Sequence, residues 1–349
     1  MKTSLLDLSF DEVKEIVEKE GQQSFRAKQI FEFAFSGVSI DEMSSLPKSF
    51  RSSLSKNYVA NPVSIYKKLV SQDKTAKYIY KLQDGNIIEG VLMRYKYGNT
   101  ICVSTQVGCR MGCKFCASGL NGLVRNLNAS EILGQVLAVN RELGGTRENR
   151  KITNIVLMGS GEPLDNYEQV TKFLKLVNAS YSLNISQRNI SLSTCGLANK
   201  IKQLANDGFS ITLTISLHSP TDEKRKTIMP IANAYSLKEV AEAAKYYFDK
   251  TGRRVVFEYA LIDGVNDSFE DAQELRNLLK GFPTHINLIP LNPVAERGLN
   301  GTPKHQVYAF QKKLEELGMS ATVRRTMGED IEGACGQLRN KILNQENRT

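Results

Sequence analysis

Several features that mark common protein classes are missing from this sequence. No apolar run reaches the roughly 20 residues needed to cross a membrane. No signal-like apolar stretch stands at the start of the 349 residues, so we expect a cytoplasmic protein without a membrane partner. A disulfide framework is typical of short secreted chains, and this chain is long with only six cysteines. Low-complexity tracts are also absent.

The charge balance is basic. Lys and Arg number 46 against 37 Asp and Glu, a formal net charge of +9. A polyanionic partner such as nucleic acid fits this balance, but the charge alone leaves the question open because many basic proteins bind no polyanion. The length allows one large domain and a smaller one. Nothing in the sequence demands a dimer, so we expect a monomer.

Four of the six cysteines lie in one short stretch, Gly98 to Gly119. Cys109, Cys113 and Cys116 follow a C-x3-C-x2-C spacing, which lets one loop supply three thiolates to an iron–sulfur cube and leaves its fourth iron open. An open iron can bind a substrate. A structural zinc ion is the alternative, and it would need a fourth ligand. The candidates are Cys102, Cys195, Cys335, His218, His285 and His305. The spacing favours a cluster.

The first 97 residues read as two parts. Apolar spacing predicts helices from Ser9 to Gly21, from about Ser24 to Phe35 and over residues 43–57, and their basic face is either solvated or RNA-binding. From about Ser64 the pattern has period two, which indicates antiparallel strands with a turn at residues 84–86. Glu89 lies within the last strand. A carboxylate there usually faces solvent, and an acid/base role with a raised pKa is the alternative.

Beyond Thr100 short β-branched runs alternate with amphipathic helices, which predicts a parallel barrel, full or partial. In such folds the loops after the strands carry the chemistry. Each polar motif falls in such a loop: the three cysteines, GSGEP, STCG, SLHSP and LNP. The predicted strands cover 101–106, 152–158, 189–194, 211–217, 254–261 and 285–291, and the helices about 129–143, 166–178, 197–207, 236–250 and 269–280.

Cys335 lies near the C-terminus, with Gly333 and Gly336 flanking the Ala334-Cys335 pair. A late cysteine is most often a buried apolar residue. The two glycines favour instead a mobile segment that could deliver a thiol, and Cys102 on the strand before the cysteine loop is a candidate partner. Cys195 has no evident role beyond packing.

Seven motifs follow one another in the order CRMGCKFC, VRNL, GSGEP, STCG, SLHSP, HINLIPLNP and ACGQL. With them, nearly the whole chain resembles the RlmN/Cfr family of radical S-adenosylmethionine (SAM) RNA methyltransferases. The resemblance implies an α/β fold, a partial (β/α)6 TIM-like radical SAM barrel at residues 98–328. It further implies a small N-terminal helical accessory, RNA-binding domain (1–60), a short antiparallel β extension that links it to the barrel (61–97), and a C-terminal segment with the methyl-carrier cysteine (329–349).

The resemblance also implies roles for individual residues. Cys109, Cys113 and Cys116 match the ligands of a [4Fe-4S] cluster. Cys335 matches the cysteine that is first methylated, Cys102 the cysteine that later releases the product through a transient disulfide, and Glu89 the proton acceptor. The positions that match the lining of the SAM site are Gly161, Glu162, Ser193, Ser216, Leu217, His218 and Asn292.

Within the family the chain is more similar to the RlmN branch. That branch methylates C2 of an adenosine in the peptidyl transferase centre of 23S rRNA and of the adenosine beside the anticodon in tRNA. It draws electrons from a donor such as flavodoxin or ferredoxin. One alternative is the Cfr branch, which methylates C8 of the ribosomal adenosine and confers antibiotic resistance. Another is an Fe-S RNA-binding protein without enzyme activity. An ordinary SAM-dependent methyltransferase is disfavoured because no GxGxxG opens the catalytic part.

Overall fold

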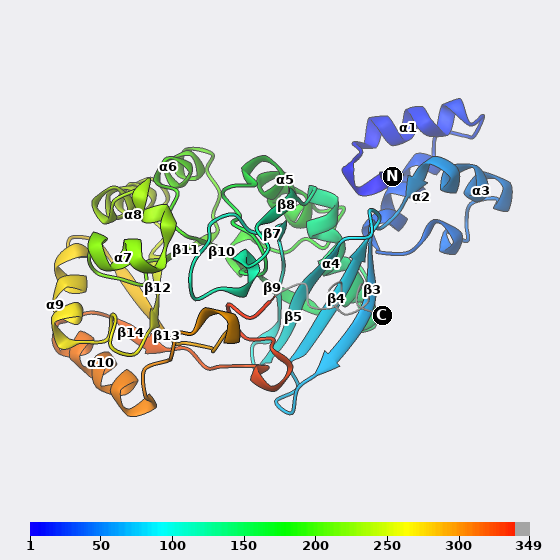
Figure 1. Ribbon diagram of the computed structural model, residues 1–349. Helices are drawn as coiled ribbons and strands as arrows, with labels where there is room; N and C mark the ends of the chain where they lie inside the picture. Colours follow the sequence, from blue (N-terminus) through cyan, green and yellow to red (C-terminus); the bar gives the residue numbers. More distant parts are fainter. Residues whose placement is uncertain (339–349) are drawn as a thin grey trace.

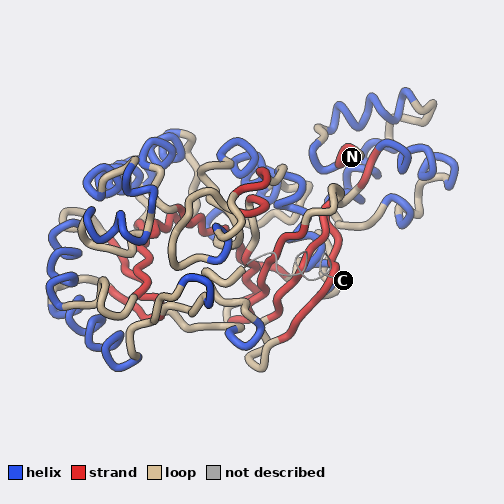
Figure 2. The backbone as a smooth tube through the Cα atoms, viewed as in Figure 1, coloured by secondary structure: helices blue, strands red, loops and turns tan. Residues whose placement is uncertain are grey.

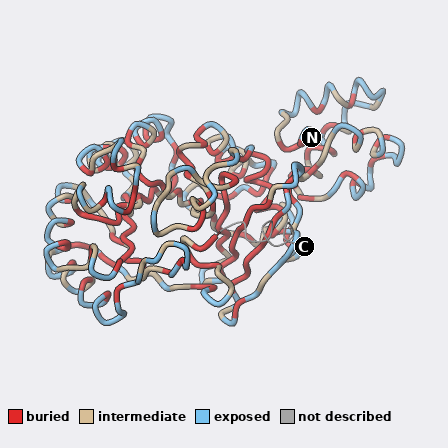
Figure 3. The backbone as a smooth tube through the Cα atoms, in the orientation of Figure 1, coloured by how far each residue is buried: buried red, intermediate tan, exposed pale blue. Residues whose placement is uncertain are grey.

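The computed structural model describes residues 1–338. One ten-stranded sheet curves through the molecule with helices along its outer side, and three N-terminal helices stand beside it (Figures 1 and 2). Figure 3 shows that the strands at its centre are mostly buried. Among residues 1–338, no helix combines the length and apolar character needed to cross a membrane.

The N-terminal part holds the three predicted helices. They are α1 (Phe10–Lys19), α2 (Arg26–Phe35) and α3 (Lys48–Asn57), and a two-residue strand on each side, β1 (Thr3–Ser4) and β2 (Tyr58–Val59), joins the ends of this part. The capping box of Ser9 and Glu12 is confirmed. The third helix starts five residues later than predicted, because Pro47 disfavours helical backbone at the residue before it.

Aromatic packing joins this part to the barrel. Tyr181, which follows the barrel helix α5 (Tyr167–Asn178), lies 4.9 Å from Phe31 and 5.1 Å from Phe35 between ring centroids. The N-terminal helices and the barrel share one continuous hydrophobic core. The packing is therefore continuous across the predicted domain boundary near residue 60, and that boundary stays a prediction.

The antiparallel extension is as predicted. It comprises β3 (Val63–Val70), β4 (Ala76–Leu82) and β5 (Ile87–Tyr95), and β5 pairs antiparallel with the first barrel strand, β6 (Gly98–Cys102). In the β4–β5 register Ile79 lies opposite Glu89. Because side chains alternate along a strand, Lys77 and Glu89 share one face of the sheet.

The parallel part confirms a partial barrel. Its strands run from β6 through β9 (Ile152–Leu157), β10 (Ile190–Thr194), β11 (Thr212–Ser216), β12 (Val255–Leu261) and β13 (Thr284–Pro290) to β14 (Ala321–Val323). The order β14-β13-β12-β11-β10-β9-β6-β5-β4-β3 leaves the edge strands β14 and β3 unjoined in the described chain. The seventh parallel strand, β14, was not predicted because three residues carry no readable period.

The five predicted barrel helices are present within two residues of their expected ends. They are α4 (Ala129–Glu142), α5, α6 (Ala198–Asn206), α8 (Leu237–Thr251) and α9 (Phe269–Leu278). Two further helices were not predicted, α7 (Asp222–Ile228) and α10 (Lys304–Glu316).

The first predicted barrel strand is too long at its end. Residues 101–106 were expected to form one strand, but β6 ends at Cys102 and Gln106 starts a separate hairpin, β7 (Gln106–Gly108) with β8 (Leu123–Asn126). The amides of Thr105 and Gln106 both donate to the Ser160 carbonyl, at 2.9 and 3.1 Å, so the chain turns toward GSGEP instead of extending the sheet.

Removing the ring of Phe35 tests the packing between the N-terminal helices and the barrel. Phe35 has no exposed surface, so Phe35→Ala should lower the free energy of unfolding by about 3–5 kcal/mol. Phe25, which is 54% exposed, provides the control, and Phe25→Ala should change it by less than about 0.5 kcal/mol. Denaturant unfolding of both variants measures the difference, and equal values would contradict this packing.

Candidate active site

A cavity of about 890 Å³ opens among the loops that follow the parallel strands. We call it the large cavity. Its lining includes nine residues predicted from the sequence: Cys109, Cys113, Cys116, Gly161, Glu162, Ser193, Ser216, His218 and Asn292. It also includes Cys335.

The three cysteines of the C-x3-C-x2-C loop line one wall of the large cavity. The loop is held by backbone contacts: the Cys109 amide donates to the Gly122 carbonyl at 2.9 Å, and Arg297 Nε donates to the Cys116 carbonyl at 3.2 Å. Burial raises the pKa of Cys109 to about 12 and raises that of Cys113 as well. Within residues 1–338, no three His, Cys, Asp or Glu side chains are gathered as ligands of a single metal ion.

Gly161 and Glu162 form the next part of the wall. Gly161 has φ of 106°, and a Cβ atom there would lie 2.6 Å from Gln106 Cβ, so only glycine fits. The Glu162 carboxylate accepts from the Cys195 amide at 2.7 Å and from the Leu164 amide at 3.0 Å. Burial raises its pKa, which these amides oppose. Glu162 thereby ties the GSGEP loop to STCG.

Ser193 and Ser216 meet at a carboxylate that the sequence did not reveal. Glu258, on β12, accepts from Ser193 Oγ at 3.0 Å and from Ser216 Oγ at 3.4 Å, and it also lines the large cavity. Its other oxygen accepts from Arg324 Nη1 at 2.9 Å. One buried acidic group on β12 therefore joins the ends of β10 and β11.

His218 is a neutral acceptor. Its Nδ1 accepts from the Ala260 amide at 2.9 Å, and burial lowers its pKa to about 3. Its backbone has φ of 55°, unusual for a residue other than glycine, and the Phe115 ring from the cysteine loop lies edge-on at 4.6 Å. Leu217 differs from its neighbours: its side chain is fully buried in the core and does not line the cavity.

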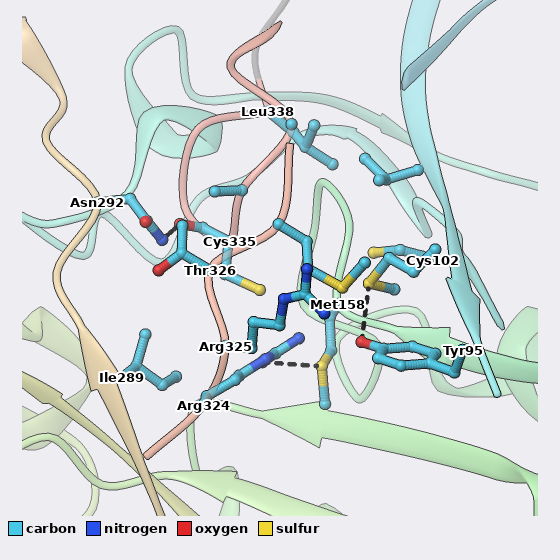
Figure 4. Close-up of a pocket in the computed structure, with 15 residues that line it drawn as sticks. Tyr95, Cys102, Met158, Ile289, Asn292, Arg324, Arg325, Thr326, Cys335 and Leu338 are labelled. Atoms are coloured by element: carbon cyan, nitrogen blue, oxygen red, sulfur yellow. Dashed lines mark hydrogen bonds between the residues drawn. The ribbon is translucent and has the colours of Figure 1, made fainter. Parts of the chain in front are cut away.

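Cys102 and Cys335 line a second, smaller cavity, which we call the two-cysteine cavity (Figure 4). Tyr95, Met158, Arg324 and Arg325 are also in its lining. The two thiols come from distant parts of the chain, Cys102 from β6 and Cys335 from the segment after β14. Burial raises the pKa of Cys102 to about 12. It raises that of Cys335 too, while the Arg324 guanidinium opposes the rise.

Backbone contacts fix the segment that carries Cys335. Asn292 Nδ2 donates to the Cys335 carbonyl at 3.0 Å, and the Gly336 carbonyl accepts from the Ala117 amide at 2.7 Å. Ser118 Oγ donates to the Leu338 carbonyl at 2.9 Å. The cysteine segment therefore rests directly on the C-x3-C-x2-C loop, and Cys335 borders both cavities.

Glu89 is buried, so the expectation of an exposed strand face is wrong. Its residue is 5% exposed, and its carboxylate lies 3.0 Å from the Lys77 ammonium. Glu89 also lines a third cavity, which we call the Glu89 cavity, together with Ser118, Val124 and Ser160. Ser118 also lines the large cavity, so the two adjoin. The other lining residues are Asn86, Ile87, Ile88, Val107, Gly108, Ala117, Asn121, Gly122 and Leu338.

Sequence reasoning missed Glu258, Arg324 and Arg325, which line these cavities, and Lys77, which pairs with Glu89 beside them. Glu258 and Lys77 lie within apolar strand sequences, so each interrupts a run of apolar residues with a charge, and that interruption is the signal that could have identified them. Arg324 had no such signal, because the three-residue β14 before it was itself not predicted.

Known proteins share this sequence over nearly its whole length. Residues 103–278 match the family model described as Radical SAM superfamily. The chain is 53% identical to "Probable dual-specificity RNA methyltransferase RlmN" of Clostridium perfringens (strain 13 / Type A), which covers 97% of each chain. It is 50% identical to the protein of that name from Clostridium botulinum (strain Hall), over 98% of this chain and 99% of that one. This chain belongs to the RlmN family.

A solved structure has the same fold. The crystal structure of a radical SAM methyltransferase from Sphaerobacter thermophilus superposes with a TM-score of 0.91 at 41% identity, covering 97% of this chain and 99% of the other. The fold of the RlmN family and its radical SAM class were thus correctly expected from the motifs. The individual residue roles within the three cavities stay predictions.

Arg324 should control the reactivity of Cys335. Its positive charge lowers the pKa of that thiol, so Arg324→Met should raise the pKa and leave less thiolate at pH 8. Alkylation of the Cys335 peptide by iodoacetamide, followed by mass spectrometry across pH, should be slower by roughly threefold or more at pH 8. Arg325→Met is the matched control from the same cavity. Unchanged alkylation in Arg324→Met would contradict the electrostatic role.

Proposed function

We propose that this protein methylates C2 of adenosine in 23S rRNA, at the peptidyl transferase centre, and in tRNA, beside the anticodon. The observation that carries the proposal is the position of Cys335, which borders both the cavity of the three cysteines and the cavity of Cys102. One sulfur can therefore take a group up on one side and release it on the other. Membership of the RlmN family supplies the RNA substrate class.

The large cavity suits a [4Fe-4S] cluster and SAM. Cys109, Cys113 and Cys116 would hold the cluster, and their burial favours this because iron stabilises thiolates that are costly in an apolar wall. SAM would lie against the backbone of Leu217 and against Gly161, Glu162, Ser193, Ser216, His218 and Asn292. When bound, these groups supply a methyl group and a carbon radical, which an electron-poor carbon such as adenine C2 requires.

Cys335, Glu89 and Cys102 would carry out the successive steps of the reaction. The Cys335 thiolate accepts a methyl group. Once that methyl group has lost one hydrogen atom to the carbon radical that bound SAM would supply, its carbon bonds to C2 of the base and joins the base to Cys335 as a thioether. The adduct loses one electron, for which the cluster would be the acceptor, and the C2 proton, which the Glu89 carboxylate accepts. The Cys102 thiolate attacks the Cys335 sulfur, so a disulfide forms as the carbon–sulfur bond breaks. The released carbon takes up a proton and leaves as the methyl group of the base. A cellular reductant restores both thiols.

The proposed partners are RNA and an electron donor. The net charge of +9 suits a polyanionic RNA, and the helical part of residues 1–60 is the proposed accessory surface for it. An electron donor such as flavodoxin or ferredoxin reduces the cluster. We propose that the protein acts as a monomer in the cytoplasm.

The decisive experiment is nucleoside mass spectrometry. Unmodified 23S rRNA fragment and tRNA are incubated anaerobically with reconstituted protein, SAM and a reductant, after iron and sulfide are measured to verify the cluster. We expect 2-methyladenosine in both RNAs. 8-Methyladenosine would place the protein with Cfr enzymes and contradict the C2 assignment. An absence of methylated base with an intact cluster would favour a non-enzymatic Fe-S RNA-binding protein.

Substitution of the two thiols separates their roles. Cys335→Ala should abolish methylation because no sulfur carries the methyl group, whereas Cys102→Ala should trap RNA covalently on Cys335. A denaturing gel shift with labelled RNA detects the adduct. Cys195→Ala, which removes another thiol of the large cavity, is the control and should form no adduct. Normal turnover by Cys102→Ala would rule out its role in release.

A further inference from the structure

Lys77 is a buried charge that none of the roles above uses. It lies on β4 with 5% of its side chain exposed. Lysine is almost never buried to this degree unless its ammonium is paired, because removing a charge from water costs several kcal/mol. The partners that compensate this cost therefore indicate why the residue is there.

The first partner is Glu89. The Lys77 Nζ atom lies 3.0 Å from Glu89 Oε1, and the two side chains are 5% and 6% exposed. The strand register places both on one face of the sheet, with Ile79 opposite Glu89 and Lys77 two residues farther along β4. In this poorly hydrated position the ammonium stabilises the ionised carboxylate and restricts its orientation.

The second partner belongs to the segment of Cys335. Lys77 Nζ also donates to the Glu332 carbonyl at 3.2 Å. Glu332 precedes Cys335 by three residues, and the amide of nearby Gly328 donates to Asp73 Oδ2 at 3.1 Å in the loop between β3 and β4. One ammonium thus contacts both the carboxylate of the Glu89 cavity and the segment that carries the methyl-accepting sulfur.

We infer that Lys77 is a positioning residue that keeps Glu89 ionised and oriented, and that ties residues 328–338 to the strand beside it. This inference rests on the proposed function, in which Glu89 accepts the C2 proton. A carboxylate that is misplaced or protonated would leave the earlier steps on Cys335 intact and impair only completion of the methyl transfer.

The test compares Lys77→Met and Lys77→Arg with Lys81→Met, an exposed lysine on the same strand. Each reconstituted protein is assayed for methyl content of Cys335, for SAM cleaved and for methyladenosine formed. In Lys77→Met, methyladenosine per SAM cleaved should fall by about tenfold or more while Cys335 methylation persists. Lys77→Arg should recover part of the methyladenosine formed per SAM cleaved, and Lys81→Met should give the same ratio as the protein without a substitution.

A second measurement does not require methylation. Hydrogen exchange followed by mass spectrometry should show faster exchange over residues 328–338 in Lys77→Met than in Lys81→Met. If the original protein forms no methylated base, the proposed function fails, but this exchange still tests the tie between Lys77 and the segment.

Three outcomes would overturn the inference. In the first, Lys77→Met keeps both the product ratio and the slow exchange. In the second, all three activities fall together with the melting temperature, which would show a general folding role. In the third, Lys77→Arg behaves like Lys77→Met in both measurements, so that the positive charge itself has no effect.

Discussion

Hydrogen bonds to the backbone hold residues 328–338 across the open side of the sheet, and the position of Cys335 depends on them. Asp73 holds one end of the segment, Asn292 the Cys335 carbonyl, and Ser118 the other end. Each such bond contributes only about 0.5–1.5 kcal/mol. Because the contacts come from three separate regions, they specify a single path for a segment that has no regular structure around Cys335.

Buried charged side chains tie neighbouring loops together behind the cavities. Arg225 has no exposed surface, and it donates to the carbonyls of Leu217, Cys195 and Ser216 at 3.1, 2.7 and 3.3 Å. It thereby joins the STCG and SLHSP loops from inside, as Glu258 joins the ends of their strands. An unpaired charge in such surroundings would be costly, so the loops are held in place by the need to satisfy these groups.

The sequence predicted the elements better than the contacts between them. Periodicity identified six parallel strands because each buries a β-branched run, and parallel strand ends necessarily bring their loops to one rim. It failed where the chain leaves its local pattern: at Gln106, which turns away from the sheet, and at β14, which is too short.

Glu89 shows why the contacts between elements could not be predicted from the sequence. Its exposure depends on Lys77, on the neighbouring β4, and on the segment around Glu332, more than 240 residues away in sequence. A local pattern contains no information about such a partner, and the usual preference of carboxylates for solvent then gives the wrong answer. Leu217 is the opposite case, a family position within the rim whose side chain belongs to the core.

The shared border at Cys335 also has a kinetic consequence. Cys335 lines both the large cavity and the two-cysteine cavity, and its sulfur can form only one new bond at a time. If Cys335 carries the methyl group as we propose, loading this carrier and discharging it are mutually exclusive, and the protein would alternate between a loaded and an unloaded form. On that proposal, RNA that arrives before Cys335 is loaded would occupy the protein without reacting, so an excess of RNA over SAM should slow turnover.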